Sequence, residues 1–188
     1  MRNNFEFQTN QLIEALRDTS AWHQQLNEVI EHLKSVFSSG QKVLVAGNGG
    51  AAAVAQHLTD EMVGKYRDSR PPLPVATLTA DGAVLTCIAN DFGFESVFAR
   101  QVEALGQPGD ILIVLSTSGE SENLFRAIDQ AKTQKMTSIA FTGSRGSLAR
   151  KADLAVVAPS DAPPRIQELH LHAIHLICER FEPGANDP

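Results

Sequence analysis

Hydrophobic residues follow two different patterns along the chain. Over residues 5–37 they recur mostly at steps of three and four, which predicts one long amphipathic helix or two shorter ones. Residues 42–46 and 111–115 each contain a short unbroken apolar run, typical of strands that are covered on both faces. Similar runs predict three further strands, over residues 75–79, 136–142 and 154–158.

Helical segments separate the predicted strands. Residues 91–94 break the helical periodicity and are expected to form a loop. Because strands alternate with helices, the sequence predicts a three-layer, doubly wound α/β fold with a five-stranded parallel sheet. Ligands of such sheets bind beyond the carboxyl ends of the strands. The helices of the core are expected from residue 51 to before the prolines at 71, 72 and 74, and over residues 82–90, 95–105, 121–134 and 163–181.

Composition and charge narrow the class of protein. The 188 residues, 43% hydrophobic and 20% charged, suit one domain with an ordinary core. A net charge of −6 without a clustered basic face argues against nucleic acid as a partner. No apolar run is long enough to cross a membrane and the N-terminus lacks a signal-peptide core, so we expect a cytoplasmic protein. Cys87 and Cys178 lie in apolar segments without CxxC spacing, which predicts buried, reduced thiols.

A glycine turn follows the first predicted strand. Gly47-Asn48-Gly49-Gly50 leads directly into an alanine-rich helix, and a helix N-terminus reached through glycines can bind an anion with its free N–H groups. The turn matches neither the dinucleotide fingerprint nor a Walker A loop. A tight turn without a ligand is the alternative.

A second polar turn follows the strand over residues 111–115. Four hydroxyl residues flank Gly119 at the start of the next predicted helix: Ser116, Thr117, Ser118 and Ser121. Hydroxyls beside a helix N-terminus suit the oxygens of a phosphate monoester. Helix capping is the alternative, although capping requires only one side-chain acceptor.

Two helices carry side chains of the metal-binding type. His57 and Glu61 are four residues apart, so they project from one helix face and could hold zinc or a neighbouring metal. The carboxylate could instead take a proton from a substrate carbon, or the pair could be solvated. In the last helix Gln167 and His175 share one stripe and are candidates to complete the site, whereas His170 and His172 lie off that stripe.

These motifs together resemble those of bacterial phosphoheptose isomerases, members of the SIS (sugar isomerase) domain superfamily. The stretches GNGG, QHLTDE, ANDFGF, STSGES and RIQELHLHAIH occur in the order and spacing of that family, over nearly the whole chain. The resemblance implies a flavodoxin-like SIS domain over residues 1–188, with a helical extension over 1–39 and an α/β core over 40–182. It also implies conversion of sedoheptulose 7-phosphate into D-glycero-D-manno-heptose 7-phosphate for nucleotide-activated heptose, with one zinc ion per subunit of a homotetramer.

The resemblance also assigns roles residue by residue. It implies that the metal is bound by His57, Glu61, Gln167 and His175. The implied substrate contacts are Asn48, Gly49, Gly50, Asn90, Asp91 and Gln167 to the sugar, and Ser116, Thr117, Ser118 and Ser121 to the phosphate. Glu61 is then expected to move a carbon-bound proton and His175 an oxygen-bound one, in roles that alternate with metal binding.

Three positions depart from the family pattern, and a second function stays open. Ala51 replaces a common Ser, Lys65 a common Arg, and Pro164 an Asp found in some relatives. These changes could mark a different heptulose phosphate or another pathway. The alternative function is a non-catalytic SIS protein that binds a protein such as the replication initiator. Such relatives tend to lose the carboxylate and the late histidine, which Glu61 and His175 retain here.

Overall fold

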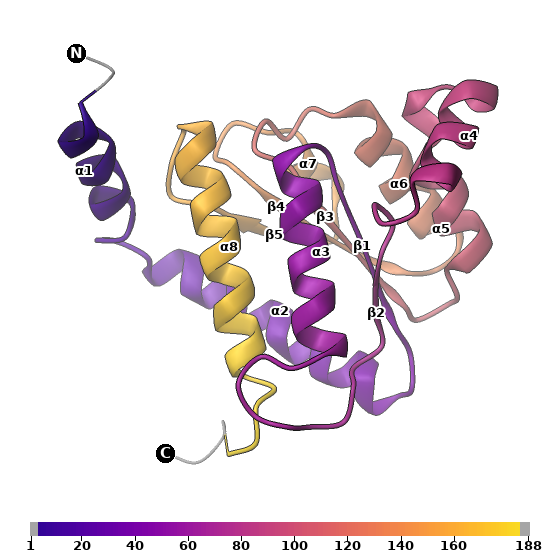
Figure 1. Ribbon diagram of the computed structural model, residues 1–188, viewed down its shortest axis with the longest axis horizontal. Coiled ribbons are helices and arrows are strands. Elements are labelled where there is room, and N and C mark those ends of the chain that lie inside the picture. Colours follow the sequence, from indigo (N-terminus) through magenta and orange to yellow (C-terminus); the bar gives the residue numbers. More distant parts are fainter. Residues whose placement is uncertain (1–3, 185–188) are drawn as a thin grey trace.

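The computed structural model describes residues 4–184 and contains one sheet of five parallel strands between two layers of helices (Figure 1). The strand order is β2-β1-β3-β4-β5, which is the flavodoxin-like order of a doubly wound sheet. The predicted fold class is therefore confirmed. The strands are β1 (Val43–Gly47), β2 (Val75–Thr77), β3 (Ile111–Leu115), β4 (Thr137–Thr142) and β5 (Leu154–Val157).

The two faces of the sheet bury two separate cores because side chains alternate along each strand. Val43 and Val45 face the core built with α2 (Ser20–Ser38), α3 (Gly50–Val63) and α8 (Pro163–Glu179). Leu44 and Ala46 face the other core. That second layer is formed by α4 (Gly82–Phe92), η1 (Phe94–Ser96), α5 (Ala99–Leu105), α6 (Glu122–Thr133) and α7 (Leu148–Lys151). No helix within residues 4–184 is both long and apolar enough to span a membrane.

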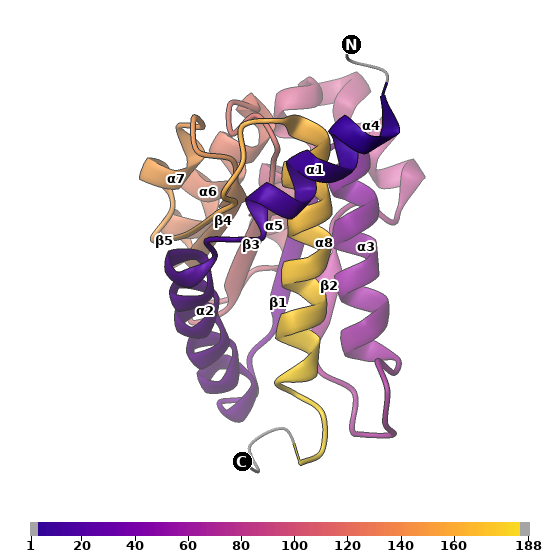
Figure 2. The ribbon, with the colours of Figure 1, turned by 90° about the vertical axis from the view of Figure 1, so that its left-hand side faces the viewer.

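The N-terminal extension forms two helices rather than one. α1 (Phe5–Ala15) begins at Asn4, whose side chain accepts a hydrogen bond of 2.9 Å from the Glu6 amide. α2 buries Trp22 on the sheet, where its ring stacks on His172 with centroids 5.8 Å apart. Figure 2 shows α1 crossing the outer side of α8. The extension therefore packs on the same layer as α3 and α8.

The structure corrects three predictions for residues 82–105. α4 continues to Phe92, so Asp91 and Phe92 are helical and the loop predicted there is wrong; the helix ends where Gly93 adopts a φ of 85°. The next helix, α5, begins at Ala99 and not near residue 95. Cys87 is exposed on α4, which contradicts the predicted buried thiol, whereas Cys178 is buried as predicted. An outward-facing helix face cannot be inferred from apolar composition alone.

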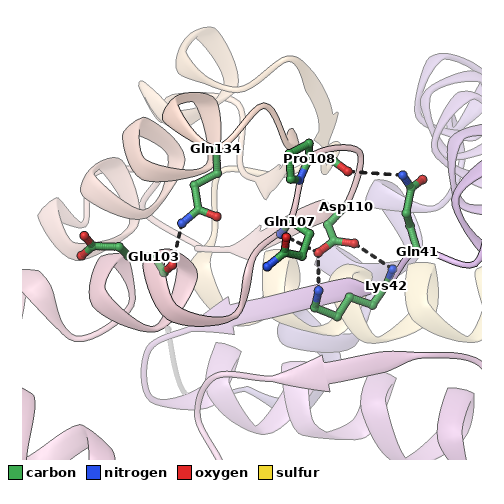
Figure 3. Close-up of polar contacts among 7 residues, drawn as sticks. All are labelled: Gln41, Lys42, Glu103, Gln107, Pro108, Asp110 and Gln134. Atoms are coloured by element: carbon green, nitrogen blue, oxygen red, sulfur yellow. Dashed lines mark hydrogen bonds and ion pairs between the residues drawn. The ribbon is translucent and has the colours of Figure 1, made fainter.

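A buried carboxylate fixes the amino ends of the two central strands (Figure 3). Asp110, with 1% of its surface exposed, accepts hydrogen bonds from the Lys42 amide at 3.0 Å and the Gln107 amide at 2.8 Å. The Lys42 ammonium neutralises it. Nearby, Gln41 donates to the Pro108 carbonyl. These bonds hold the starts of β1 and β3 together, so Gly47 and Leu115 end the two strands side by side.

The buried side of α8 carries a histidine whose pKa is strongly lowered. His170 is 1% exposed and its ring meets Phe141 edge to face, with centroids 6.1 Å apart. Burial lowers the pKa of His170 to about 4, and the nearby Thr142 backbone opposes this only in part. The folded protein therefore binds a proton there at lower pH than the unfolded chain.

His170 should make the protein sensitive to mild acid. Between pH 6.5 and 4 the unfolded chain binds a proton at His170 and the folded chain does not, so the free energy of unfolding should fall by about 3 kcal/mol across this range. In His170→Leu that part of the loss should disappear. Urea unfolding at a series of pH values measures it. His32→Leu, which removes an exposed imidazole on α2, should keep the parent's pH dependence. A parent-like dependence in His170→Leu would contradict the assignment.

Candidate active site

The glycine turn and the hydroxyl turn meet at the carboxyl edge of the sheet, as the sequence predicts. β1 ends at Gly47 and α3 begins at Gly50, with Gly49 at a φ of 55°. β3 ends at Leu115 and leads into the second turn. Together they enclose a pocket of about 150 Å³. Its walls are Asn48, Gly50, Ala51, Leu115, Ser116, Thr117, Ser118, Ser121 and Gln167.

The hydroxyl groups in this pocket divide into two kinds. Ser116 Oγ accepts a bond of 3.0 Å from the Gly119 amide and Ser118 Oγ accepts one of 3.3 Å from the Glu120 amide, so these two shape the loop. Within residues 4–184 the hydroxyls of Thr117 and Ser121 make no hydrogen bond, and Ser121 does not cap α6. Uncapped amides and free hydroxyls at a helix N-terminus are suited to an anion. Capping therefore does not account for Ser121.

Asn123 joins the two turns, and its role was not apparent in the sequence. Its side-chain amide and that of Asn48 exchange two hydrogen bonds, each of 2.9 Å, and Asn123 is only 3% exposed. The pair holds the start of α6 against the glycine turn. Its position two residues after STSGES was a weak signal, because nothing local indicates a partner 75 residues away.

Gln167 closes the pocket from α8. Its amide lies against Gly50 so closely that a Cβ at residue 50 would collide with it. Only a glycine leaves that space for the amide. Gly50 stands seven residues before His57, or roughly 10 Å along α3, so Gln167 lies at the pocket and not beside His57 in this chain.

A second cluster lies further along α3 and α8, which run side by side (Figure 1). His57 Nε2 is 2.9 Å from His175 Nε2 and 3.5 Å from Glu61 Oε1. Asp60 lies 3.2 Å from His57 Nδ1 and orients the ring. One ligand atom from each of His57, Glu61 and His175 fits within 4.8 Å of the others. The structure thus brings together three of the four residues expected at the metal.

The donor set of this cluster fits zinc. Zinc–ligand bonds of 2.0–2.1 Å in a tetrahedron separate two ligand atoms by about 3.3 Å, and the two distances from His57 lie on either side of that value. Near the cluster, the pKa of the Cys178 thiol is raised to about 12. Burial is the main cause, and the negative charge of Glu61 raises it further. That thiol stays protonated and is therefore a poor zinc ligand.

Asn90 and Asp91 stand apart from both clusters. They lie exposed in the last turn of α4, where Asn90 Nδ2 donates to Asp91 Oδ1 at 2.7 Å. No hydrogen bond in the described part of the chain links either residue to the pocket. Their predicted contact with the sugar stays a prediction.

Known proteins with similar sequences and structures share this arrangement of elements. A family model described as the SIS domain matches residues 4–143. A phosphoheptose isomerase of Sulfurimonas denitrificans is 45% identical over 159 residues, which are 84% of this chain and 82% of that protein. One from Aquifex aeolicus is 45% identical over 160 residues, 85% of this chain and 84% of its own. The structure of a phosphoheptose isomerase from Francisella tularensis matches with a TM-score of 0.85 at 37% identity, covering 93% of this chain and 92% of that one.

The strand order and the hydroxyl turn beside a helix N-terminus define an SIS domain. At this level the class is sugar isomerase, a group that includes several kinds of protein. The extent and identity of the matches are more specific: the chain belongs to the phosphoheptose isomerase family and is an isomerase.

Removal of the Ser121 hydroxyl should weaken phosphate binding in the pocket. A hydrogen bond to a charged group contributes about 1.5 kcal/mol or more to the free energy of binding. Ser121→Ala should therefore lower the affinity for inorganic phosphate about 10-fold. Amide chemical shifts of the two turns, followed by NMR during a phosphate titration, measure it. Ser20→Ala removes a hydroxyl at the N-terminus of α2 and should leave the affinity unchanged. Equal affinities in all three proteins would place the phosphate elsewhere.

Proposed function

We propose that the protein interconverts sedoheptulose 7-phosphate and D-glycero-D-manno-heptose 7-phosphate through an enediol. The observation that carries the proposal is the meeting of Glu61 and His175, 114 positions apart in sequence, at His57. The phosphate group would sit in the hydroxyl pocket. That pocket and the cluster lie two to three turns apart along α3, which suits a substrate with its phosphate on C7 and its reacting carbons at C1 and C2.

The acid/base pair matches the proton transfers of the reaction. Glu61 removes a proton from C1 while the C1–C2 double bond forms and the C2 oxygen gains a proton. Return of a proton to C2 and loss of the C1 hydroxyl proton then give the aldehyde. Glu61, with 17% of its side chain exposed, transfers the carbon-bound proton, and His175 transfers the oxygen-bound proton. We further propose that His175 assists opening of the sugar ring.

We propose zinc as the metal of the cluster, held by His57, Glu61 and His175 with Gln167 as a fourth donor. When bound, zinc would supply a positive charge that polarises the carbonyl and enediol oxygens. The same Glu61 and His175 atoms cannot bind metal and move protons at one moment, so the two roles alternate. Gln167 reaches the pocket in this chain, and its part as a ligand stays a prediction.

We also propose a homotetramer in the cytoplasm. Support for assembly comes from α1 and α4, whose apolar side chains face outward. Phe5 is 90% exposed and Phe7 47% on α1, and Phe92 is 50% exposed on α4. Surfaces of this kind favour contact with another chain. The non-catalytic alternative has no support from the comparisons, since the relatives at about 45% identity are isomerases by name.

Glu61→Gln should lose nearly all turnover. Removing a general base costs about 10²- to 10⁴-fold, and the amide keeps the shape of the carboxylate. Proton NMR of the purified protein with sedoheptulose 7-phosphate follows formation of the aldose. Glu31→Gln, which alters an exposed carboxylate on α2, should retain the parent's activity. Full turnover in Glu61→Gln would remove Glu61 as the base, and no turnover in the parent would overturn the proposed function.

Zinc binding should depend on the histidines of the cluster, such as His57, and not on the nearby His172. Calorimetry of the metal-free protein with Zn²⁺ should show one site per chain. His57→Gln should weaken it about 100-fold or more, since losing a ligand costs at least as much as losing an outer partner. His172→Gln, which alters the ring stacked on Trp22, serves as the control. Zinc affinity retained in His57→Gln would mean that the metal binds elsewhere.

A further inference from the structure

The segment after α3 passes beneath the end of α8 before it enters β2 (Figure 1). Two of its side chains reach the cluster and the helix end. The Tyr66 ring covers His175, with centroids 5.8 Å apart, and Arg67 pairs with Glu179 at 2.7 Å on the surface. The Tyr66 ring therefore covers one side of His175 in the candidate active site.

Arg70 caps the helix that carries Glu61. The last carbonyls of a helix have no partner within the helix, and a positive charge there is favoured by the helix dipole. Arg70 Nη2 donates to the Glu61 carbonyl at 2.8 Å and Nη1 donates to the Met62 carbonyl at 2.9 Å. The guanidinium thus binds the backbone of the proposed base itself.

Glu182 holds Arg70 in this position. The side chains of Arg70 and Glu182 are 5% and 6% exposed, with Nε and Oε1 3.4 Å apart. Glu182 Oε2 accepts hydrogen bonds from the Asp68 amide at 2.6 Å and the Arg67 amide at 3.3 Å. A buried charge without its partner is strongly unfavourable, so each of the two charges requires the other.

We propose that Arg70 and Glu182 are positioning residues that set Glu61 against His175, an inference that rests on the proposed function. Arg70 fixes the last turn of α3, where Glu61 lies. Glu182 stands three residues beyond the last residue of α8, the helix of His175. The ion pair thus joins the ends of the two helices that supply the acid and the base. Without it the last turn of α3 frays and the carboxylate of Glu61 loses its fixed distance to His175.

Arg70→Met and Glu182→Gln test the pair, and Arg17→Met, which breaks an exposed ion pair with Glu14, is the matched control. In both test variants kcat should fall about 10- to 100-fold, as when a supporting partner of a catalytic group is lost. KM should stay within about 2-fold because the phosphate pocket lies at the other end of α3. Amide hydrogen exchange over residues 61–64 should accelerate in both variants. Arg17→Met should match the parent in all three measurements.

The double variant separates positioning from stability. With both charges removed, no buried charge is left unpaired, so its unfolding temperature should exceed that of either single variant. Its kcat should remain low because the Glu61 carbonyl still lacks the guanidinium. Recovery of kcat together with stability would overturn the inference, as would parent-like kcat in folded Arg70→Met. Unchanged exchange at the end of α3 would overturn it independently of turnover. Absence of turnover in the parent would instead overturn the proposed function.

Discussion

The packing of α3 against α8 on one face of the sheet governs where the chemistry lies. The two helices come from opposite ends of the α/β core, and both begin at the carboxyl edge of the sheet. Small buried side chains such as Ala55 and Ala173 face the shared core. Because the two helices run side by side in the same direction, residues at the start of α3 contact residues near the start of α8. Residues further along α3 contact residues further along α8. Gly50 meets Gln167, and two turns on, His57 meets His175.

The two edges of the sheet use polar groups in opposite ways. At the amino edge the Asp110 carboxylate is bonded to two amides and an ammonium, so its charge is satisfied within the chain (Figure 3). At the carboxyl edge the hydroxyls of Thr117 and Ser121 have no partner among the described residues. Satisfied polar groups stabilise a fold, whereas convergent unsatisfied ones provide a binding site. Rigid strand starts are what keep the donors at the far edge in place.

The sequence was sufficient for the strands, the order of elements and the two turns, because these depend on local periodicity and glycine positions. It was also sufficient for one face of α3, since His57 and Glu61 are fixed by helix geometry. It was not sufficient for Asn123, Arg70 or Glu182. Their partners lie far away in the chain or are backbone groups, and no local pattern indicates such contacts. The prediction that Cys87 is buried was wrong for a related reason: the exposure of a residue on α4 depends on which elements pack against that helix.

The positions that depart from the family pattern lie around the acid/base pair and not within it. Ala51 lines the pocket as a buried methyl, so the pocket offers one hydroxyl fewer than a serine there would give. Lys65 is exposed one turn beyond Glu61, where an ammonium keeps the charge but lacks the two-pronged geometry of a guanidinium. Pro164 lies in the first turn of α8. If the proposed function holds, such changes would act on how the sugar phosphate is bound. In the proposed mechanism, proton transfer depends on Glu61 and His175, and the proposed role of Arg70 and Glu182 is to set the geometry of that pair. Changes at residues 51, 65 and 164 would then alter substrate preference and leave the reaction type the same.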